Sequence, residues 1–313
     1  MPNASTPGWK GTWNLSGRTP EMDPMDTTDF RPDPRLFPFE SRWFRSPAGK
    51  VHYLDEGEGR PILFLHGNPT WSFLYRGIII RLRKHFRCIA PDYPGFGLSD
   101  HPQDYRYTPE EHADVVRALV QELDLQDLVI MGHDWGGPMG MQVALQETPR
   151  IRALIMGNTW YWPTEALHLR AFSWLLSTGF AQGMLHKGNV LVDRLIPLGV
   201  KHKLAPEVLE HYRGPFPTAD SRAGSVELVR QLTLSSNWLG ALEDAVAEEL
   251  GHLPLLLTWG VEDLAFTPAF MDTFRRDFSR ARVVRLEARH FIQEDTPGEL
   301  SRAIREFVEG LDS

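Results

Sequence analysis

The sequence has little cysteine and little positive charge. Cys88 is the single cysteine among 313 residues, so no disulfide can form within the chain. This excludes a disulfide-stapled scaffold and fits a reducing compartment. Lys and Arg (33) are outnumbered by Asp and Glu (41), which gives a net charge of −8. Because binding to phosphate backbones needs concentrated cations, we expect no nucleic-acid partner.

Long apolar runs are also missing. No run reaches the length needed to cross a membrane, and the first residues show neither the apolar region nor the cleavage pattern of a secretory signal. We therefore expect no membrane association and a cytoplasmic protein. Hydrophobic residues still make up 42% of the chain, which is enough for one large packed domain with an inserted subdomain.

Short apolar runs alternate with helical patterns from about residue 34 onwards. Between 109 and 123, apolar residues recur at helical spacing, and Thr108 precedes them as a candidate N-cap. This alternation predicts an α/β fold with a mostly parallel central sheet flanked by helices. The predicted strands are 61–65, 88–92, 128–132, 153–157, 253–259 and 281–286.

The alternation stops between residues 160 and 235, where aromatic residues and helical patterns dominate. An insertion between two strands of an open α/β sheet can cover their carboxyl ends, where active sites lie. We interpret 160–235 as a helical cap and 34–159 with 236–313 as the core; the alternative is that 160–235 adds further core helices. Residues 1–33 lack periodicity and predict a loosely ordered arm, unless Trp9 and Trp13 dock on the core.

A motif for covalent catalysis follows the strand predicted at 128–132. The run 132–137 reads GHDWGG, with small residues two positions before and after Asp134. This spacing is typical of the nucleophile elbow, in which a sharp strand-to-helix turn presents the central residue. That residue is usually serine, but the chain contains no G-x-S-x-G run. A carboxylate can attack carbon directly and form an ester, so Asp134 is the predicted nucleophile; the alternative is that it only caps the following helix.

Two further residues follow the last two predicted strands in the order expected for this chemistry. Asp263 follows the strand predicted at 253–259, and His290 follows the strand predicted at 281–286. The chain order of nucleophile, acid and histidine is that of α/β-hydrolases. We select Asp263 over the neighbouring Glu262 as the acid. The earlier strand at 153–157 ends near Asn158 without a carboxylate, which favours Asp263.

Two residues are candidates for binding a leaving anion. Asn68 follows His66-Gly67, and Trp135 follows the nucleophile; in this fold, backbone N–H groups at these two positions form the oxyanion hole. Both residues also carry side-chain N–H donors, which can stabilise a departing halide. The alternatives are that Asn68 shapes a turn before Pro69 and that Trp135 only packs in the core.

With these motifs the chain resembles a haloalkane dehalogenase of the α/β-hydrolase superfamily, from about Leu36 to Val308. The most specific matching segments are 66–71, 92–100, 132–137 and 290–294, and 213–217 resembles the segment returning from the family's cap. The pairing of an Asn/Trp halide site with an Asp-His-Asp triad resembles one subfamily. We interpret 92–100 as a structural loop near the site rather than as a phosphate-binding loop.

The resemblance implies hydrolysis of small apolar haloalkanes to alcohol, halide and a proton, without metal or organic cofactor. Asp134 would form an alkyl ester while Asn68 and Trp135 hold the halide, and water activated by His290, oriented by Asp263, would cleave the ester. We assign three aromatic residues to the substrate pocket: Phe172, Trp174 and Phe291. The substrate, a halide ion and water are the expected partners, and the oligomeric state is left open.

Three other functions compete with this one. An epoxide hydrolase shares the fold and the triad and activates the epoxide oxygen with cap tyrosines, for which Tyr161 and Tyr212 are candidates. A luciferase-like or non-catalytic ligand-binding relative would keep the fold, but the luciferase relatives take the acid from the earlier strand, where Asn158 stands here. A fluoroacetate dehalogenase is disfavoured because Trp135 stands where that family has arginine.

Overall fold

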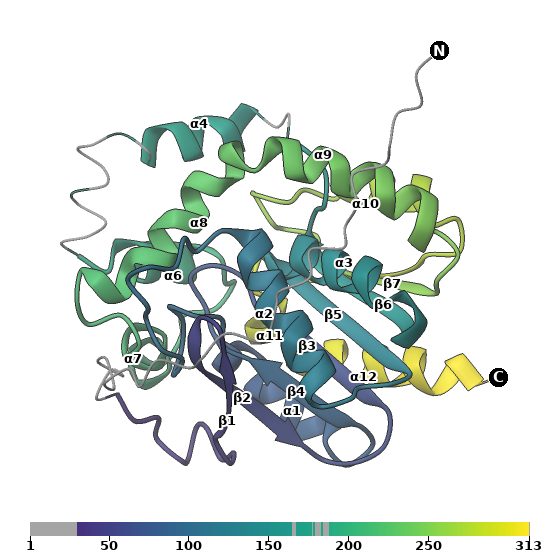
Figure 1. The fold of residues 1–313 in the computed structure, drawn as a ribbon, viewed down its shortest axis with the longest axis horizontal. Helices are drawn as coiled ribbons and strands as arrows, with labels where there is room; N and C mark the ends of the chain where they lie inside the picture. The colour runs from purple at the N-terminus through teal and green to yellow at the C-terminus, as the bar shows by residue number, and fades with distance from the viewer. Residues whose placement is uncertain (1–29, 165–166, 177, 179–182, 184–187, 313) are drawn as a thin grey trace.

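The fold is built on one eight-stranded sheet (Figure 1). The computed structural model describes residues 30–164, 167–176, 178, 183 and 188–312. The strands lie in the order β1-β2-β4-β3-β5-β6-β7-β8; β1 and β2 are antiparallel to their neighbours and the other pairs are parallel. The predicted mostly parallel sheet is therefore confirmed. The strands are β1 (Arg42–Ser46), β2 (Gly49–Glu56), β3 (Pro61–Leu65), β4 (Arg87–Pro91), β5 (Leu128–Asp134), β6 (Ile151–Thr159), β7 (Leu255–Gly260) and β8 (Arg282–Leu286).

The six strands predicted from apolar runs are β3 to β8, whereas β1 and β2 were not predicted. Every residue of β3 and β5 is buried, which explains why these strands appear as uninterrupted apolar runs. β1 has one buried residue, Phe44, and four partly or fully exposed ones. Its pattern is that of a half-solvated edge strand, which has no continuous apolar run to recognise.

Helices cover both faces of the sheet (Figure 1). On one face α1 packs against α12, and on the other α3 packs against α2, α9 and β5. The predicted N-cap of α2 is confirmed, because the Thr108 side chain accepts a hydrogen bond from the Glu111 N–H. The helices are α1 (Arg76–Leu82), α2 (Pro109–Glu122), α3 (Gly136–Gln146), α4 (Leu167–Leu176), α6 (Ile196–Leu198), α7 (Pro206–Arg213), α8 (Ala223–Leu234), α9 (Ser236–Ala245), α10 (Phe270–Asp277), α11 (Ile292–Asp295) and α12 (Pro297–Glu309).

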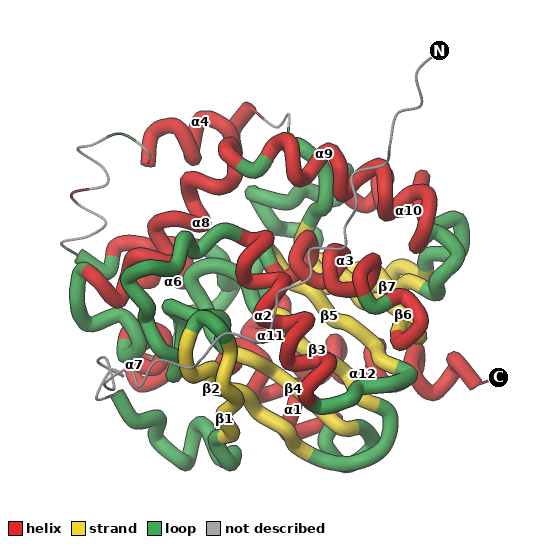
Figure 2. Tube along the Cα trace, viewed as in Figure 1, coloured by secondary structure: helices red, strands yellow, loops and turns green. Residues whose placement is uncertain are grey.

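The chain between β6 and β7 forms helices, and none of its described residues belongs to a strand (Figure 2). It contains α4, α6, α7, α8 and α9, of which α4 packs on α8 and α9 packs on α3. A hydrogen bond of 2.7 Å from Trp238 Nε1 on α9 to Gln142 Oε1 on α3 ties the last of these helices to the core. Short helical turns complete the fold: η1 (Ser72–Tyr75), η2 (Thr148–Arg150), η3 (Leu191–Leu195), η4 (Asp220–Arg222), η5 (Val246–Leu250) and η6 (Gly310–Asp312).

The end of the predicted N-terminal arm is held against the body. Phe30 packs edge-on against Trp71 and His211, with ring centroids 6.1 and 5.8 Å apart. The Asp33 N–H donates to His211 Nε2 at 2.9 Å. Phe30 and Asp33 are thus held against the body, and the partly buried Phe30 ring packs among aromatic side chains. Trp9, Trp13 and the rest of 1–29 lie outside the described residues.

The turn from β5 into α3 depends on close backbone packing. A Cβ atom added at Gly136 would lie 2.1 Å from the backbone oxygen of Leu65, and one at Gly137 would lie 1.9 Å from Thr159 Oγ1. Asp134, at the end of β5, has a φ of +51°, a left-handed conformation that non-glycine residues adopt with strain. The small residues therefore allow α3 to start directly against β3 and β6.

We predict that Gly136→Ala destabilises the protein by roughly 1–3 kcal/mol, the usual cost of overpacking, because the added methyl group meets backbone atoms that cannot turn aside. The matched control is Gly298→Ala in α12, where no atom lies within 4 Å of the added Cβ. This control is expected to leave stability unchanged or to raise it by up to about 1 kcal/mol. Urea unfolding measures both, and equal stability of the two variants would contradict the packing argument.

Candidate functional site

The structure brings Asp134, His290 and Asp263 together from three parts of the chain. Asp134 ends β5, Asp263 follows β7, and His290 follows β8. His290 Nδ1 lies 2.9 Å from Asp263 Oδ2, and His290 Nε2 lies 3.9 Å from Asp134 Oδ2. With Nδ1–H donating to the Asp263 carboxylate, Nε2 is the nitrogen left to accept a proton on the Asp134 side.

Both oxygens of the Asp134 carboxylate have a defined environment. Oδ1 accepts a hydrogen bond of 2.8 Å from the Asn68 backbone N–H, and the Trp135 backbone N–H also bonds to the carboxylate. Oδ2 is the oxygen nearer to His290. The two backbone donors therefore lie at the positions expected for an oxyanion hole, and Oδ2 is left to react.

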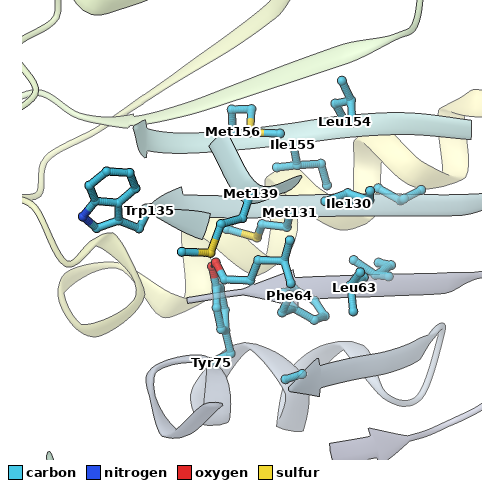
Figure 3. Packing of buried hydrophobic residues seen from close by; sticks show 14 of the residues in the cluster. Leu63, Phe64, Tyr75, Ile130, Met131, Trp135, Met139, Leu154, Ile155 and Met156 are labelled. Carbon is cyan, nitrogen blue, oxygen red and sulfur yellow. The ribbon is translucent and has the colours of Figure 1, made fainter. Parts of the chain in front are cut away.

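The side chains of the two candidate halide ligands differ in their surroundings. One amide N–H of Asn68 donates to the Ser225 backbone oxygen of α8 at 2.9 Å, so only the second N–H remains for an anion. The Trp135 ring is 2% exposed and packs edge-on against Trp160 at 4.8 Å. No hydrogen bond from its indole N–H to another described residue is found, and the indole N–H of the neighbouring Trp160 is buried without a partner among them. Figure 3 shows Trp135 beyond the arrowhead of β5, apart from the side chains along the strands.

Burial and nearby charges shift the pKa values of these groups. Burial raises the pKa of Asp134; His290 and the N–H groups of Trp135 and Asn68 oppose this, but the pKa stays above its ordinary value. Burial lowers the pKa of His290, but attraction and hydrogen bonding from Asp263, with attraction from Asp134, outweigh it and raise the pKa. Burial likewise raises the pKa of Asp263, yet His290 and other donors leave it below its ordinary value. Asp263 is thus the more acidic of the two carboxylates.

Two positioning contacts escaped the sequence analysis. Asn158 donates from Nδ2 to Asp263 Oδ2 at 2.8 Å, while its Oδ1 accepts from the Gly260 N–H at 2.8 Å. His133 Nε2 lies 2.8 Å from the His290 backbone oxygen, and burial lowers the pKa of His133 to about 3, so this ring is neutral. In the sequence, Asn158 marks only a place where an acid is missing, and His133 is only part of the elbow motif.

The predicted pocket aromatics have different outcomes. Phe291 is 2% exposed, and its ring centroid lies 4.7 Å from that of His290, so the structure places it beside the site. Trp174 on α4 is 70% exposed, which corrects its assignment to an enclosed pocket wall. α4 lies on the outside of α8, so its free face points to solvent (Figure 1). The Phe172 side chain lies outside the described residues.

Both candidate cap tyrosines have hydroxyl groups that are already hydrogen-bonded to carboxylates. The Tyr161 hydroxyl donates to Asp277 Oδ2 at 2.5 Å. The Tyr212 hydroxyl donates to Glu294 Oε1, and the same carboxylate accepts from Arg76 at 2.5 and 2.9 Å. Both rings are fully buried. Neither hydroxyl is left free to activate a substrate oxygen.

The structure offers no sign of a metal centre or a membrane helix in the part of the chain that it describes. Within the described residues, no group of three or more His, Cys, Asp or Glu side chains could hold a metal ion. Over the same residues, each helix is too short or too polar to cross a membrane.

The 92–100 loop is held by hydrogen bonds within the loop and to neighbouring residues. Asp92 accepts N–H groups of Ser72 and Leu98 and pairs with the buried His52 at 2.8 Å. The Ser99 hydroxyl donates to the Asp92 backbone oxygen at 2.7 Å. These contacts consume the polar groups of the loop, which fits the structural interpretation made from the sequence.

We predict that Asp134→Asn stabilises the folded protein at pH 8. A carboxyl whose pKa folding raises binds more protons when folded, so its contribution to stability falls as the pH rises above its ordinary value of 3.8. Asparagine also tolerates the left-handed backbone of the elbow. Urea unfolding of both proteins at pH 8 and pH 4 should show the larger gain at pH 8; a loss of stability at pH 8 would contradict this.

Comparison with known proteins places this geometry in a family. A family model described as alpha/beta hydrolase fold matches residues 60–197. Haloalkane dehalogenase 2 of Mycobacterium tuberculosis is 46% identical over 280 residues, which covers 89% of this chain and 98% of the relative. A cis-3-alkyl-4-alkyloxetan-2-one decarboxylase of Shewanella oneidensis is 31% identical over 286 residues, 87% of this chain and 89% of the relative.

The comparison of structures agrees. The crystal structure of the haloalkane dehalogenase DbeA from Bradyrhizobium elkani matches with a TM-score of 0.80 and 26% identity, over 88% of this chain and 99% of that one. A putative ancestral haloalkane dehalogenase matches with a TM-score of 0.80 and 28% identity, over 87% and 99%. The fold with its mostly parallel sheet and the similarity to these relatives lead to the same assignment: the chain belongs to the haloalkane dehalogenase family of α/β-hydrolases.

Proposed function

We propose that the chain hydrolyses haloalkanes to an alcohol, a halide ion and a proton through an alkyl ester on Asp134. The observation that carries this proposal is the arrangement around the Asp134 carboxylate: Oδ1 accepts the Asn68 N–H at 2.8 Å while Oδ2 lies 3.9 Å from His290 Nε2. A carboxylate so placed is an ionised nucleophile at neutral pH and needs no base for its first step.

In the first step, Asp134 Oδ2 attacks the carbon that bears the halogen. The new C–O bond forms as the carbon–halogen bond breaks, and the electron pair of that bond leaves with the halide. Trp135 Nε1–H and the free amide N–H of Asn68 hold the departing anion. Burial supports this step, because a poorly hydrated carboxylate is a better nucleophile.

In the second step, water attacks the Asp134 carbonyl carbon while His290 Nε2 accepts a proton from it. Oδ1, already bonded to the Asn68 N–H, becomes the oxyanion, and collapse of the intermediate releases the alcohol and restores the carboxylate. Asp263 stabilises the imidazolium, and Asn158 holds Asp263 in place. Esterification also removes the Asp134 charge, which is one of the causes that raise the pKa of His290, so a larger fraction of His290 is neutral and able to accept a proton.

We further propose that residues 160–235 act as a cap over this site, while 34–159 and 236–313 carry the catalytic groups. The Asn68 side chain, bonded to α8, supports a cap that touches the anion site directly. Small apolar haloalkanes, halide and water are the proposed ligands.

Epoxide hydrolysis is disfavoured by the two tyrosines. Activation of an epoxide oxygen requires free hydroxyl donors, and those of Tyr161 and Tyr212 are engaged by Asp277 and Glu294. A non-catalytic ligand-binding role is disfavoured by the paired His290 and Asp263, and a luciferase-like role by Asn158, which stands at the earlier acid position.

The decarboxylase relative supports a second candidate substrate. Its name describes an enzyme that acts on cis-3-alkyl-4-alkyloxetan-2-ones, and it is 31% identical to this chain. Opening such a ring at its sp³ carbon releases a carboxylate, an anion that the same N–H donors can hold. Halide release is favoured because haloalkane dehalogenase 2 is 46% identical.

We predict that the protein releases halide and protons from 1-bromobutane and 1,2-dibromoethane. The Asp134→Ala variant should lose this activity, because no other carboxylate ends the elbow strand. Halide titration and pH-stat measure it. Styrene oxide and a cis-3,4-dialkyloxetan-2-one are assayed in parallel for diol and carbon dioxide. Carbon dioxide without halide would move the assignment to the decarboxylase reaction, and diol without halide would move it to epoxide hydrolysis. The absence of all products would remove support for each.

We predict that His290→Ala traps the ester, because alkylation needs no base and hydrolysis does. Incubation with 1-bromobutane should add the mass of one butyl group, which peptide mass spectrometry should locate on Asp134. The double variant Asp134→Ala/His290→Ala is the matched control and should gain no mass. Rapid turnover by His290→Ala without trapped ester would contradict the two-step scheme.

A further inference from the structure

A second charged site lies outside the candidate active site, between α1 and α12. These two helices pack against each other, and an open pocket of about 220 Å³ lies between them. No Asp or Glu belongs to the described residues that line it. The lining residues are Arg81, Leu82, His85, Gly298, Ser301, Arg302 and Arg305.

The cationic side chains of this pocket are spaced so that they repel one another. Arg302 and Arg305 are three positions apart on α12, and Arg81 lies on α1. Like charges at this helical spacing are destabilising without a counter-ion. Elsewhere this acidic chain pairs arginine with carboxylates, as Arg87 pairs with Asp55 at 2.7 Å. Neither Arg81 nor Arg302 has a carboxylate of a described residue within ion-pair distance, and the Arg81 guanidinium donates to the Gly77 backbone oxygen at 2.5 Å.

Arg305 also borders the pocket, with a side chain that is 43% exposed and one nitrogen that is buried. Its Nε atom is buried and meets no hydrogen-bond acceptor among the described residues. The nearest carboxylate oxygen, Glu309 Oε1, is 3.9 Å away, beyond hydrogen-bond distance. A buried N–H of a charged group left without an acceptor is costly, and an oxygen of a ligand in the pocket would satisfy it.

The start of α12 adds positive potential to the same place. Gly298 lies in its first turn and lines the pocket, and no atom lies within 4 Å of a Cβ added there. The N-cap residue Thr296 makes no side-chain cap hydrogen bond. First-turn N–H groups lack partners within the helix and favour negative charge, and the Glu299 carboxylate in the same turn offsets part of this potential.

We propose that this pocket binds a phosphate-bearing anion, with the guanidinium groups of Arg81, Arg302 and Arg305 on phosphoryl oxygens. Three planar guanidiniums match an anion with several charges and many acceptor oxygens, since arginine binds phosphate in a bidentate manner. A halide ion offers one charge and no such geometry. The phosphate group could belong to a free diphosphate or to an anionic lipid headgroup, and both share this chemistry.

Isothermal titration of the full chain with inorganic pyrophosphate at low ionic strength tests the proposal. Arg302→Ala should weaken binding by roughly ten-fold or more, because it removes a charge-assisted bidentate pair. Lys84→Ala is the matched control: it removes one exposed positive charge beside α1, but Lys84 does not line the pocket. Its affinity should stay within about two-fold of wild type, since only a screened charge is lost. Far-UV circular dichroism and urea unfolding check that both variants fold.

Sedimentation with phosphatidylglycerol vesicles, against phosphatidylcholine vesicles, distinguishes the two sources. The site is supported if the protein binds pyrophosphate or phosphatidylglycerol vesicles, and if Arg302→Ala loses this binding while Lys84→Ala keeps it. The probe that binds then identifies the source of the phosphate group. Absent binding to both probes, or equal losses in the two variants, would overturn it. None of these readouts uses dehalogenase activity, so the site stands or falls separately from the proposed reaction.

Discussion

Asp134 ends a strand whose seven residues are all buried, so its carboxylate lies in the interior, away from bulk water. A buried charge is costly unless partners compensate it, and here the compensation comes from the Asn68 and Trp135 N–H groups and from His290. The compensation is incomplete, as the raised pKa shows. The left-handed backbone at φ +51° is a second cost at the same residue. Strain and desolvation concentrated at one side chain are typical of a site selected for reactivity rather than stability.

The partners of this carboxylate are held by contacts that reach into the helices between β6 and β7. The Asn68 side chain bonds to α8, the Trp71 indole N–H donates to the His211 backbone oxygen on α7, and Tyr212 on α7 reaches Glu294 on α11. α11 begins two residues after His290. The position of the histidine loop and the position of α7 are therefore linked through one buried carboxylate. A shift of these helices would move the side chain of Asn68 and the loop of His290 together.

The elements predicted best are those whose pattern is local. β3 was predicted residue for residue because each of its five residues is buried and apolar, and α2 was predicted from helical spacing and its Thr108 cap. β1 was missed because it is an edge strand with one buried side chain. The pocket assignment of Trp174 was wrong because an aromatic residue in a helical sequence does not show which face of the helix is buried. Packing decides which face of α4 contacts α8, and the exposed Trp174 lies on the other face.

By itself, the sequence determined the alternation of strands and helices, the elbow around Asp134 and the chain order of Asp134, Asp263 and His290. These features depend on local apolar runs and on residue types at the ends of strands, which a single chain displays directly. Only the tertiary structure decided which groups are free to act. The two tyrosines are engaged by Asp277 and Glu294, and one Asn68 N–H by α8. Arg81 on α1 and Arg302 on α12 face one pocket. Such pairings join residues far apart in the chain. Which donor groups are hydrogen-bonded and which stay free is therefore decided only when the elements pack together.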